Sequence, residues 1–294
     1  MHYIFVINGR QDFAYIEEEI RKQLENVDIH YTVYLTTGVG DGTRYTRIYC
    51  DLHRQEEVCF VACGGMGICN EVASGIVGET NKSMALIPYG FTNDIIKSLP
   101  ERDYKSLEKI LNGTVTKLDI LRINDNYALN VCNFGFDSIV AIEANYLTEI
   151  GKSKPYERGI ARAFIGGRFN RIQVVADGVP LNRRLLLSCS LANGQYVGGQ
   201  FRCAPKANLS DGYMDICLLK AMSTFSFFRL MKDYQKGNHL SPKYGRNVTY
   251  TKAKHVDIHS KNLTYLVLDG EMLPGKDFSV DLIPQAIRFV IPSE

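Results

Sequence analysis

The sequence predicts two domains, an α/β domain built on a parallel sheet and then a domain of antiparallel β-strands. Its 294 residues exceed the length of one average domain. Apolar strand-like runs alternate with helical patterns over about the first 100 residues, whereas the chain beyond Thr114 consists mostly of strand-like runs separated by turn residues. Length alone leaves one large α/β domain as the alternative, but the change of rhythm favours two.

The N-terminal pattern indicates a parallel sheet covered by helices. Ile16, Ile20 and Leu24 recur at helical spacing across a charged stretch, which predicts a helix after the first strand. The other elements are predicted as strands over Tyr3–Asn8, Ile29–Leu35, Val58–Cys63 and Met84–Pro88 and helices over Tyr45–His53 and Asn70–Gly78. Ligands of such sheets bind at the carboxyl ends of the strands.

The C-terminal pattern indicates an antiparallel β domain with helical insertions. The strands are predicted over Leu118–Ile123, Tyr127–Phe134, Ile172–Val175, Leu185–Ala192, Tyr213–Leu219, His255–His259 and Tyr265–Asp269. Helices are predicted over Asp137–Leu147, Tyr156–Phe169 and Phe225–Lys236. The last of these should end at Gly237, because glycine is the usual residue after a helix C-terminus.

Composition and charge exclude several classes of protein. Hydrophobic residues make up 45% and charged residues 22%, and no apolar run approaches the roughly 18 residues of a membrane span. The N-terminus lacks the features of a signal peptide, so we expect a cytoplasmic protein. The net charge of +2 arises from interspersed signs and gives no footprint for nucleic acid, although a local basic patch facing anionic lipid would be hidden in this sum.

The cysteines and histidines predict neither disulfides nor a zinc site. Most of the eight cysteines lie in apolar strand-like runs, which favours buried free thiols: Cys59, Cys63, Cys132, Cys189 and Cys217. His255 and His259 have the spacing of ligands on a helix, but the surrounding alternation is that of a strand. A strand would separate them by about 13 Å, too far for one zinc ion.

Two turns carry the chemistry of the first domain. Gly64, Gly65 and Gly67 follow a strand and precede a helix, so the main chain can approach a ligand and the helix start can bind a phosphate. The alternative is a tight turn without a ligand. The next turn runs from Pro88 to Asp94, where Thr92 or Asn93 could cap a helix and Asp94 could serve only as a first-turn carboxylate.

The order of short motifs along the chain resembles the diacylglycerol kinase catalytic-domain family, which includes bacterial lipid kinases and sphingosine kinases. The resemblance covers nearly the whole chain. Its motifs are Asn8, Gly64–Glu71, Pro88–Asp94, Asn130 with Gly135–Asp137, Asn193–Gly194 with Gly198–Gly199, Ala204–Ala207, Asp211–Asp215, Gly237–His239 and Leu268–Glu271. NAD kinases share the glycine-rich turn, but Asn70–Glu71 and Asp211–Asp215 favour the lipid kinases.

The resemblance implies an architecture and a reaction. Residues 1–122 would form the nucleotide-binding α/β domain, joined by a returning C-terminal strand at 285–294, and residues 123–284 would form a β-sandwich that binds the lipid substrate. ATP would donate a phosphoryl group to the hydroxyl of a membrane lipid, with Mg²⁺ held by acidic side chains. It also implies transient contact with the membrane surface, and a homodimer is left open.

The resemblance assigns roles to individual residues. Asp269 and Glu271 correspond to the general base, since deprotonating an alcohol needs a carboxylate within reach; alternatively, Asp269 only forms a turn between two strands. The nucleotide would contact Asn8, Thr36, Gly64, Gly65, Met66, Gly67, Ile68, Asn70, Glu71, Phe91, Thr92 and Asn93. Catalytic Mg²⁺ would involve Asp94 and Asp119, and a structural Mg²⁺ or Ca²⁺ would lie near Asp211 with main-chain oxygens of Asn208 and Tyr213.

The nucleotide turn departs from the family pattern. Met66 replaces an aspartate, Ile68 a threonine and Phe91 a threonine. Because these changes remove polar contacts, a second interpretation is a catalytically impaired relative that binds lipid or nucleotide and acts as a regulatory protein. The segment Gly40–Thr43 spells the missing Gly-Asp-Gly-Thr pattern and is a hypothetical compensation, although such turns are common in loops.

Overall fold

The computed structural model describes residues 1–9, 13–89, 93–153, 158–160, 162–163, 171–183 and 185–294. It divides into two compact units: unit 1 contains Met1–Ile120, Leu209–Asp211 and Ile283–Glu294, and unit 2 contains Leu121–Asn208 and Gly212–Leu282. The segment Leu209–Asp211 differs from the predicted division of the chain. It joins unit 1 because the Asp119 N–H donates to the Leu209 carbonyl at 2.7 Å.

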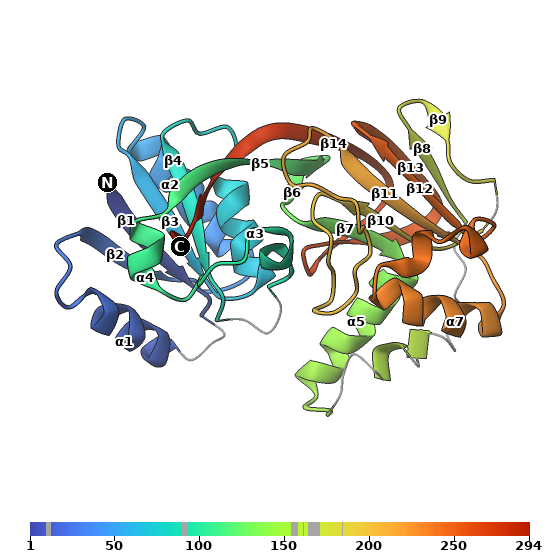
Figure 1. Ribbon diagram of the computed structural model, residues 1–294, viewed down its shortest axis with the longest axis horizontal. Coiled ribbons are helices and arrows are strands. Elements are labelled where there is room, and N and C mark those ends of the chain that lie inside the picture. Colours follow the sequence, from blue (N-terminus) through green and yellow to red (C-terminus); the bar gives the residue numbers. More distant parts are fainter. Residues whose placement is uncertain (10–12, 90–92, 154–157, 161, 164–170, 184) are drawn as a thin grey trace. The chain divides into compact units, whose positions relative to one another are not determined.

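Unit 1 is built on a parallel sheet with the strand order β2-β1-β3-β4-β14. Its strands, blue to cyan in Figure 1 apart from the red end of β14, are β1 (His2–Ile7), β2 (His30–Leu35), β3 (Val58–Cys63), β4 (Lys82–Ile87) and the end of β14 (Glu271–Ile291). Phe289 of β14 pairs with Met84 of β4, so the last strand returns to this sheet as predicted.

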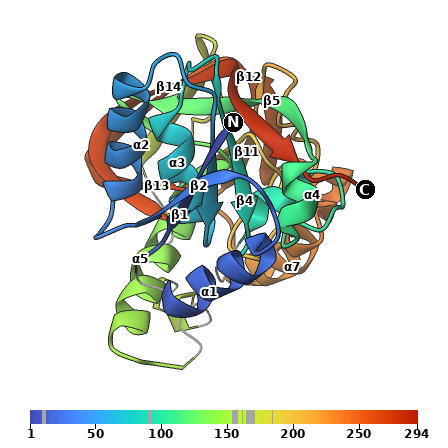
Figure 2. The same cartoon turned by 90° about the vertical axis from the view of Figure 1, so that its left-hand side faces the viewer.

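Helices cover both faces of this sheet (Figure 2), as the alternating pattern predicts. The helices are α1 (Phe13–Leu24), α2 (Asp41–Leu52), α3 (Met66–Gly75) and α4 (Leu107–Leu111), with a 3₁₀ turn η1 (Asp94–Ser98). Ile16 and Ile20 of α1 share one apolar cluster with Leu107 of α4 and with Val61 of β3. On the other face Tyr49 of α2 packs edge-on against Phe60 of β3, so a layered core fixes the sheet.

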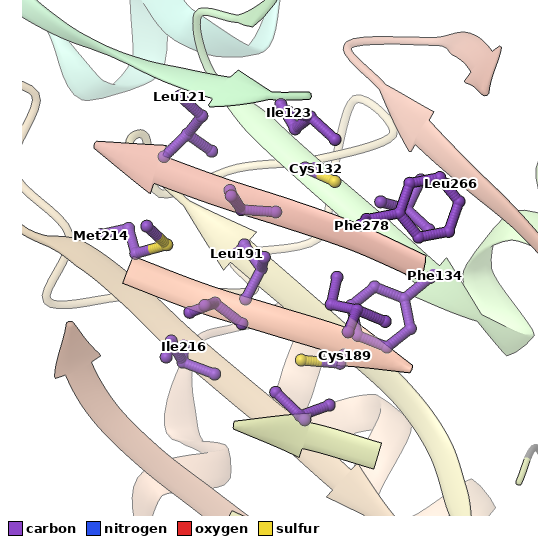
Figure 3. Packing of buried hydrophobic residues seen from close by; sticks show 14 of the residues in the cluster. Leu121, Ile123, Cys132, Phe134, Cys189, Leu191, Met214, Ile216, Leu266 and Phe278 are labelled. Carbon is purple, nitrogen blue, oxygen red and sulfur yellow. The ribbon is translucent and has the colours of Figure 1, made fainter. Parts of the chain in front are cut away.

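Unit 2 is an antiparallel β-sandwich. Its strands are β6 (Asn126–Ala128), β7 (Val131–Gly135), β8 (Ile172–Ala176), β9 (Val179–Pro180), β10 (Leu186–Ala192), β11 (Met214–Lys220), β12 (Val248–Ala253), β13 (His255–Leu268) and the first part of β14, while β5 (Thr114–Ile123) runs from unit 1 into unit 2. The order is β12-β11-β10-β7-β13-β14, with β8 also paired to β13. Figure 3 shows the apolar core of this unit, which includes Phe134, Leu191 and Phe278.

Helices α5 (Phe136–Glu149) and α7 (Thr224–Gln235) pack on the outer face of the strands β7, β10 and β11. Phe136 of α5 and Phe227 of α7 meet edge-on with ring centroids 5.2 Å apart. Two 3₁₀ turns follow α7, η2 (Asn238–Leu240) and η3 (Pro242–Tyr244). Gly237 has a φ of 78° directly after α7, which confirms the predicted glycine at this helix end.

Several predicted boundaries are wrong. Helices α2 and α3 begin four residues before the predicted Tyr45 and Asn70, because glycines next to a helix start were interpreted as loop. Tyr127–Phe134, predicted as one strand, is divided between β6 and β7, whereas β13 and β14 are each one long strand where shorter ones were predicted. The predicted helix over Tyr156–Phe169 lies largely outside the described residues.

Two predictions about chemistry are confirmed. All eight cysteines are free and buried. Burial raises the pKa of the Cys59 thiol to about 12, so it stays protonated and inert at neutral pH. Among the described helices, none combines the length and the apolar character that crossing a membrane requires.

Candidate functional site

Four strands of unit 1 end at the same level, and a loop leaves each end. The last residues of these strands pair in register and are Leu35, Ile7, Cys63 and Ile87. The Thr36 N–H donates to the Ile7 carbonyl at 3.0 Å, and the Gly64 N–H donates to the Ile87 carbonyl at 3.1 Å. Asn8, Thr36 and Gly64, three predicted nucleotide contacts, therefore lie side by side at the carboxyl edge of the sheet.

Thr36 holds the loop after the first strand. Its buried hydroxyl accepts the Gly9 N–H at 3.1 Å. A Cβ atom on Gly9 would lie 2.0 Å from the Thr36 carbonyl oxygen, so only glycine fits this close approach. The loop that carries Asn8 is therefore fixed by main-chain packing against the next strand end.

The start of α3 offers main-chain donors to an anion. Gly65 occupies the N-cap position without a side-chain cap, and the Cys69 N–H is the one that donates back to the Gly65 carbonyl, at 3.2 Å. The N–H groups of the first turn have no intrahelical acceptor. A Cβ on Gly67 would meet no atom of the described residues within 4 Å. Open space beside the first turn of α3 suits a phosphate group.

Met66 and Ile68 face the interior of unit 1. Their exposed fractions are 5% and 3%, so both side chains pack as core residues. The Ile68 Cδ1 atom would lie 3.0 Å from a Cβ atom on Gly42, which places it against the start of α2. Neither side chain can supply the polar contact that the family pattern has at its position.

Glu71 ties α2 to α3. Its buried carboxylate accepts the Gly40 N–H at 2.9 Å and the Gly42 N–H at 2.7 Å, and its carbonyl accepts the Thr43 hydroxyl at 2.9 Å. A carboxylate at the N-terminus of a helix is stabilised by the free N–H groups and the helix dipole. Glu71 thus acts on the scaffold of the predicted nucleotide loop, and Asn70 beside it is also buried.

Asp41 does not replace the missing aspartate. Its carboxylate accepts hydrogen bonds from the Arg44 guanidinium at 2.6 Å, from the Thr37 N–H at 2.8 Å and from the Tyr34 hydroxyl at 2.9 Å. The bond from Arg44, followed by that from Thr37, holds the pKa of Asp41 far below its usual range. The carboxylate is engaged within its own loop, so the hypothesis of compensation by Gly40–Thr43 is not supported.

The two aspartates predicted near catalytic Mg²⁺ have separate protein partners. The buried Asp94 lies 3.3 Å from the Lys97 ammonium, and the fully buried Asp119 accepts the Gln285 N–H at 2.8 Å. Among the described residues, no three His, Cys, Asp or Glu side chains form a group that could hold a metal ion. Phe91 and Thr92 lie outside the described residues, and Asn93 precedes η1 at its N-cap position.

The loop predicted to hold a structural cation is a turn with a positive φ of 76° at Gly212. Asp211 is half-buried, whereas Asn208 and Tyr213 are exposed. Asp211 belongs to unit 1, and its two proposed companions belong to unit 2. A cation on this loop stays a prediction.

Asp269 and Gly270 form a two-residue hairpin turn in unit 2. Leu268 pairs with Glu271, and both turn residues have positive φ, 50° and 102°. Such values are required by the tight turns that favour Asp-Gly. The Asp269 carboxylate accepts the N–H groups of Asn130 and Val131, each at 2.9 Å.

The two predicted base residues therefore differ in their surroundings. Both oxygens of Asp269 hold the hairpin against the start of β7, whereas Glu271 is half-buried at the start of β14. The partners of Asp269 lie more than a hundred residues earlier in the chain, so the local sequence carries no signal for this contact.

His239, part of the motif Gly237–His239, is a core residue of unit 2. Its ring is fully buried, 4.6 Å from the Tyr234 ring and with Nε2 3.4 Å from the Cys217 Sγ atom. Burial lowers the pKa of His239 to about 4, so it is neutral near pH 7. This motif supports the packing of the segment after α7.

Comparisons with known proteins agree with this arrangement. Residues 2–123 match the diacylglycerol kinase catalytic domain, and residues 130–291 match the YegS C-terminal NAD kinase beta sandwich-like domain. A diacylglycerol kinase of Bacillus subtilis is 27% identical over 98% of this chain and 94% of its own length. A protein of Yersinia enterocolitica named as a probable lipid kinase YegS-like is 26% identical over 99% of this chain and 97% of its own length.

Solved structures show the same fold. A diacylglycerol kinase from Bacillus anthracis superposes with a TM-score of 0.72 at 19% identity, covering 98% of this chain and 96% of the other. An NAD kinase from Archaeoglobus fulgidus solved with ATP gives a TM-score of 0.51 at 10% identity, covering 99% of this chain and 94% of the other. The two domain matches together span nearly the whole sequence, and the chain therefore belongs to the family of diacylglycerol kinases and YegS-like lipid kinases.

Proposed function

We propose that the protein transfers the γ-phosphoryl group of ATP to the hydroxyl group of a membrane lipid. The observation that carries the proposal is the alignment of Asn8, Thr36 and Gly64 at the carboxyl edge of the unit 1 sheet, next to the open first turn of α3. Family membership supplies the class of reaction.

The residues present fit the phosphates of a nucleotide better than they fit Mg²⁺. Main-chain N–H groups at the start of α3 suit phosphate oxygens, and the missing side chain of Gly67 leaves room for them. The carboxylates of Asp94 and Asp119 are engaged with Lys97 and with the Gln285 N–H. No step of the reaction is therefore assigned to the metal.

In the proposed step, the lipid hydroxyl oxygen forms a bond to the γ-phosphorus while the bond between that phosphorus and the β,γ-bridging oxygen breaks. ADP leaves with the bridging oxygen. The Glu271 carboxylate takes the hydroxyl proton, and Asp269 positions Glu271 by fixing the hairpin turn between them. Glu271 is preferred as the base because the Asp269 oxygens already accept two main-chain N–H groups.

A second candidate function is that of a catalytically impaired relative which retains binding of lipid or nucleotide. The observation in its favour is the burial of Met66 and Ile68, which leaves the glycine-rich turn without the polar side chains of the family pattern. Main-chain donors alone would bind phosphates more weakly than a turn with an added aspartate and threonine.

One experiment separates the two candidates. Calorimetric titration of the protein with ATP and with ADP, with and without Mg²⁺, measures nucleotide binding, and incubation with γ-³²P-labelled ATP and vesicles of diacylglycerol or a sphingoid base measures transfer. Labelled lipid that disappears with the Glu271→Gln variant supports the kinase. Nucleotide or lipid binding without labelled lipid from any acceptor in the panel supports the binding protein.

A further inference from the structure

Unit 2 carries a basic pocket away from the residues discussed so far. It has a volume of about 640 Å³ and is lined by Pro180, Leu181, Asn182, Arg183, Lys220 and Arg246. Three of these six described side chains are cationic and none is acidic. We call this site the basic pocket.

The cations of the basic pocket have no carboxylate partner. Within the described part of the chain, none of Arg183, Lys220 and Arg246 forms an ion pair. The Lys220 N–H donates to the Asn247 carbonyl at 2.8 Å, which fixes the end of β11 beside the loop that carries Arg246. Three like charges held around one pocket repel each other and attract an anion.

Two aromatic side chains project from the adjoining helix α7. Phe225 is 79% exposed, the largest fraction of any large hydrophobic side chain among the described residues, and Phe228 is 55% exposed. They stand three residues apart on one side of the helix, whereas Phe227 and Leu230 are buried on the other. We call Phe225 and Phe228 the aromatic pair. Their exposure indicates a surface that meets an apolar partner.

The aromatic pair and the basic pocket are neighbours along two segments. Phe225 helps to line a smaller hollow of about 150 Å³ together with Met222, Ser226, Arg229, Lys243, Tyr244 and Asn247. Met222 lies two residues after Lys220, and Asn247 directly follows Arg246, so the hollow and the basic pocket flank the same two segments. Lys243 is paired with Asp233 at 2.7 Å, while Arg229 adds a further exposed cation.

We propose that the basic pocket and the aromatic pair form a membrane-docking surface for anionic phospholipids. The phosphate of a headgroup would occupy the pocket among Arg183, Lys220 and Arg246, while the rings of the aromatic pair enter the boundary between headgroups and acyl chains. Charge complementarity favours this occupant, because a free phosphate ion would use the cations and leave the rings in water. The helix α7 would lie along the bilayer surface with its buried side on the unit 2 core (Figure 1).

This inference deepens the proposed function by giving a place where the protein meets the membrane that holds its lipid acceptor. It does not depend on phosphoryl transfer, since vesicle binding is measured without nucleotide. Failure of docking and failure of catalysis are therefore distinguishable.

The test is co-sedimentation of the full chain with vesicles of phosphatidylcholine alone or of an equimolar mixture with phosphatidylglycerol. We expect binding to the anionic vesicles that weakens as salt rises. Lys220→Gln with Arg246→Gln should weaken this binding roughly 30-fold, and Phe225→Ser with Phe228→Ser about tenfold or more. Circular dichroism should show that both variants remain folded, because all four side chains are at least partly exposed.

Matched controls come from the hairpin of β13 and β14. Lys261→Gln with Lys276→Gln removes the same charge, and Leu263→Ser with Met272→Ser removes exposed apolar side chains. The controls should bind as the parent does. Equal binding by all variants, or equal binding to both kinds of vesicle, would overturn the inference. Calorimetric binding of inorganic phosphate to the pocket without vesicle binding would also overturn it, in favour of a site for a free anion.

Discussion

The Asp269 carboxylate accepts the main-chain N–H of Val131 at 2.9 Å, across 138 positions of the sequence. Its second oxygen accepts the N–H of Asn130 at the same distance. A charged acceptor that satisfies two neighbouring main-chain donors is a strong structural contact, because charge-assisted hydrogen bonds exceed neutral ones. The Asp-Gly-Glu segment thereby divides into a residue that fixes the hairpin and a residue, Glu271, that we propose as the base.

Asp269→Asn should destabilise unit 2. The amide keeps the shape of the side chain but retains only one acceptor oxygen, so one of the two N–H groups faces an NH₂ group. We expect a loss of about 3 kcal/mol in the free energy of unfolding, measured by urea denaturation. Asp277→Asn is the control, since that carboxylate side chain is 73% exposed and should change stability little. A stability equal to the parent's would show that the two hydrogen bonds contribute nothing.

Glu271→Gln should have the opposite effect. If the protein phosphorylates a lipid, turnover should fall by about 10²–10⁴-fold, the usual contribution of a general base, because the amide cannot accept the proton. The melting temperature should barely change, since Glu271 is half-buried at a strand end. A lowered melting temperature with unchanged turnover per folded molecule would remove Glu271 from the mechanism.

Met66→Asp with Ile68→Thr should restore polar groups to the nucleotide turn. We expect nucleotide to bind about tenfold more tightly in the presence of Mg²⁺, equivalent to about 1.4 kcal/mol, as measured by calorimetry. Because both parent side chains are buried, the variant should also unfold at a lower temperature. Met66→Leu with Ile68→Val is the apolar control. A folded polar variant that binds no better than the parent would exclude this turn as the phosphate site.

His239 should make stability depend on pH. The unfolded chain takes up a proton near the ordinary histidine pKa of 6.5, whereas burial lowers the pKa in the folded state to about 4. Below pH 6.5 the unfolded state therefore binds more protons, so stability should decrease as pH falls from 6.5 to 4, by about 3 kcal/mol over the whole window.

Urea denaturation of the parent and of His239→Gln between pH 7 and pH 4 measures this effect, and the variant should show a shallower decrease over that window. Titration of labelled histidine by NMR should place the midpoint for His239 near 4. A midpoint at the ordinary histidine value would mean that the ring is accessible to water.

The periodicity of side chains was sufficient to predict most of the secondary structure. The strand Val58–Cys63 was predicted with its observed bounds, because an uninterrupted apolar run followed by glycine describes a buried strand and its end. Starts of helices were predicted late at Asp41 and Met66, since glycine at the beginning of a helix resembles a loop. The residues that hold those starts, Glu71 among them, come from distant positions in the chain.

The sequence by itself determined the class of fold, the family and the set of side chains available for chemistry, because spacing and residue type are local properties. Only the tertiary structure decided which of those side chains are already engaged. It gave the oxygens of Glu71 to Gly40 and Gly42, and those of Asp269 to Asn130 and Val131. Such contacts follow from packing between segments far apart in the chain, where main-chain donors must find acceptors, and no local pattern records them.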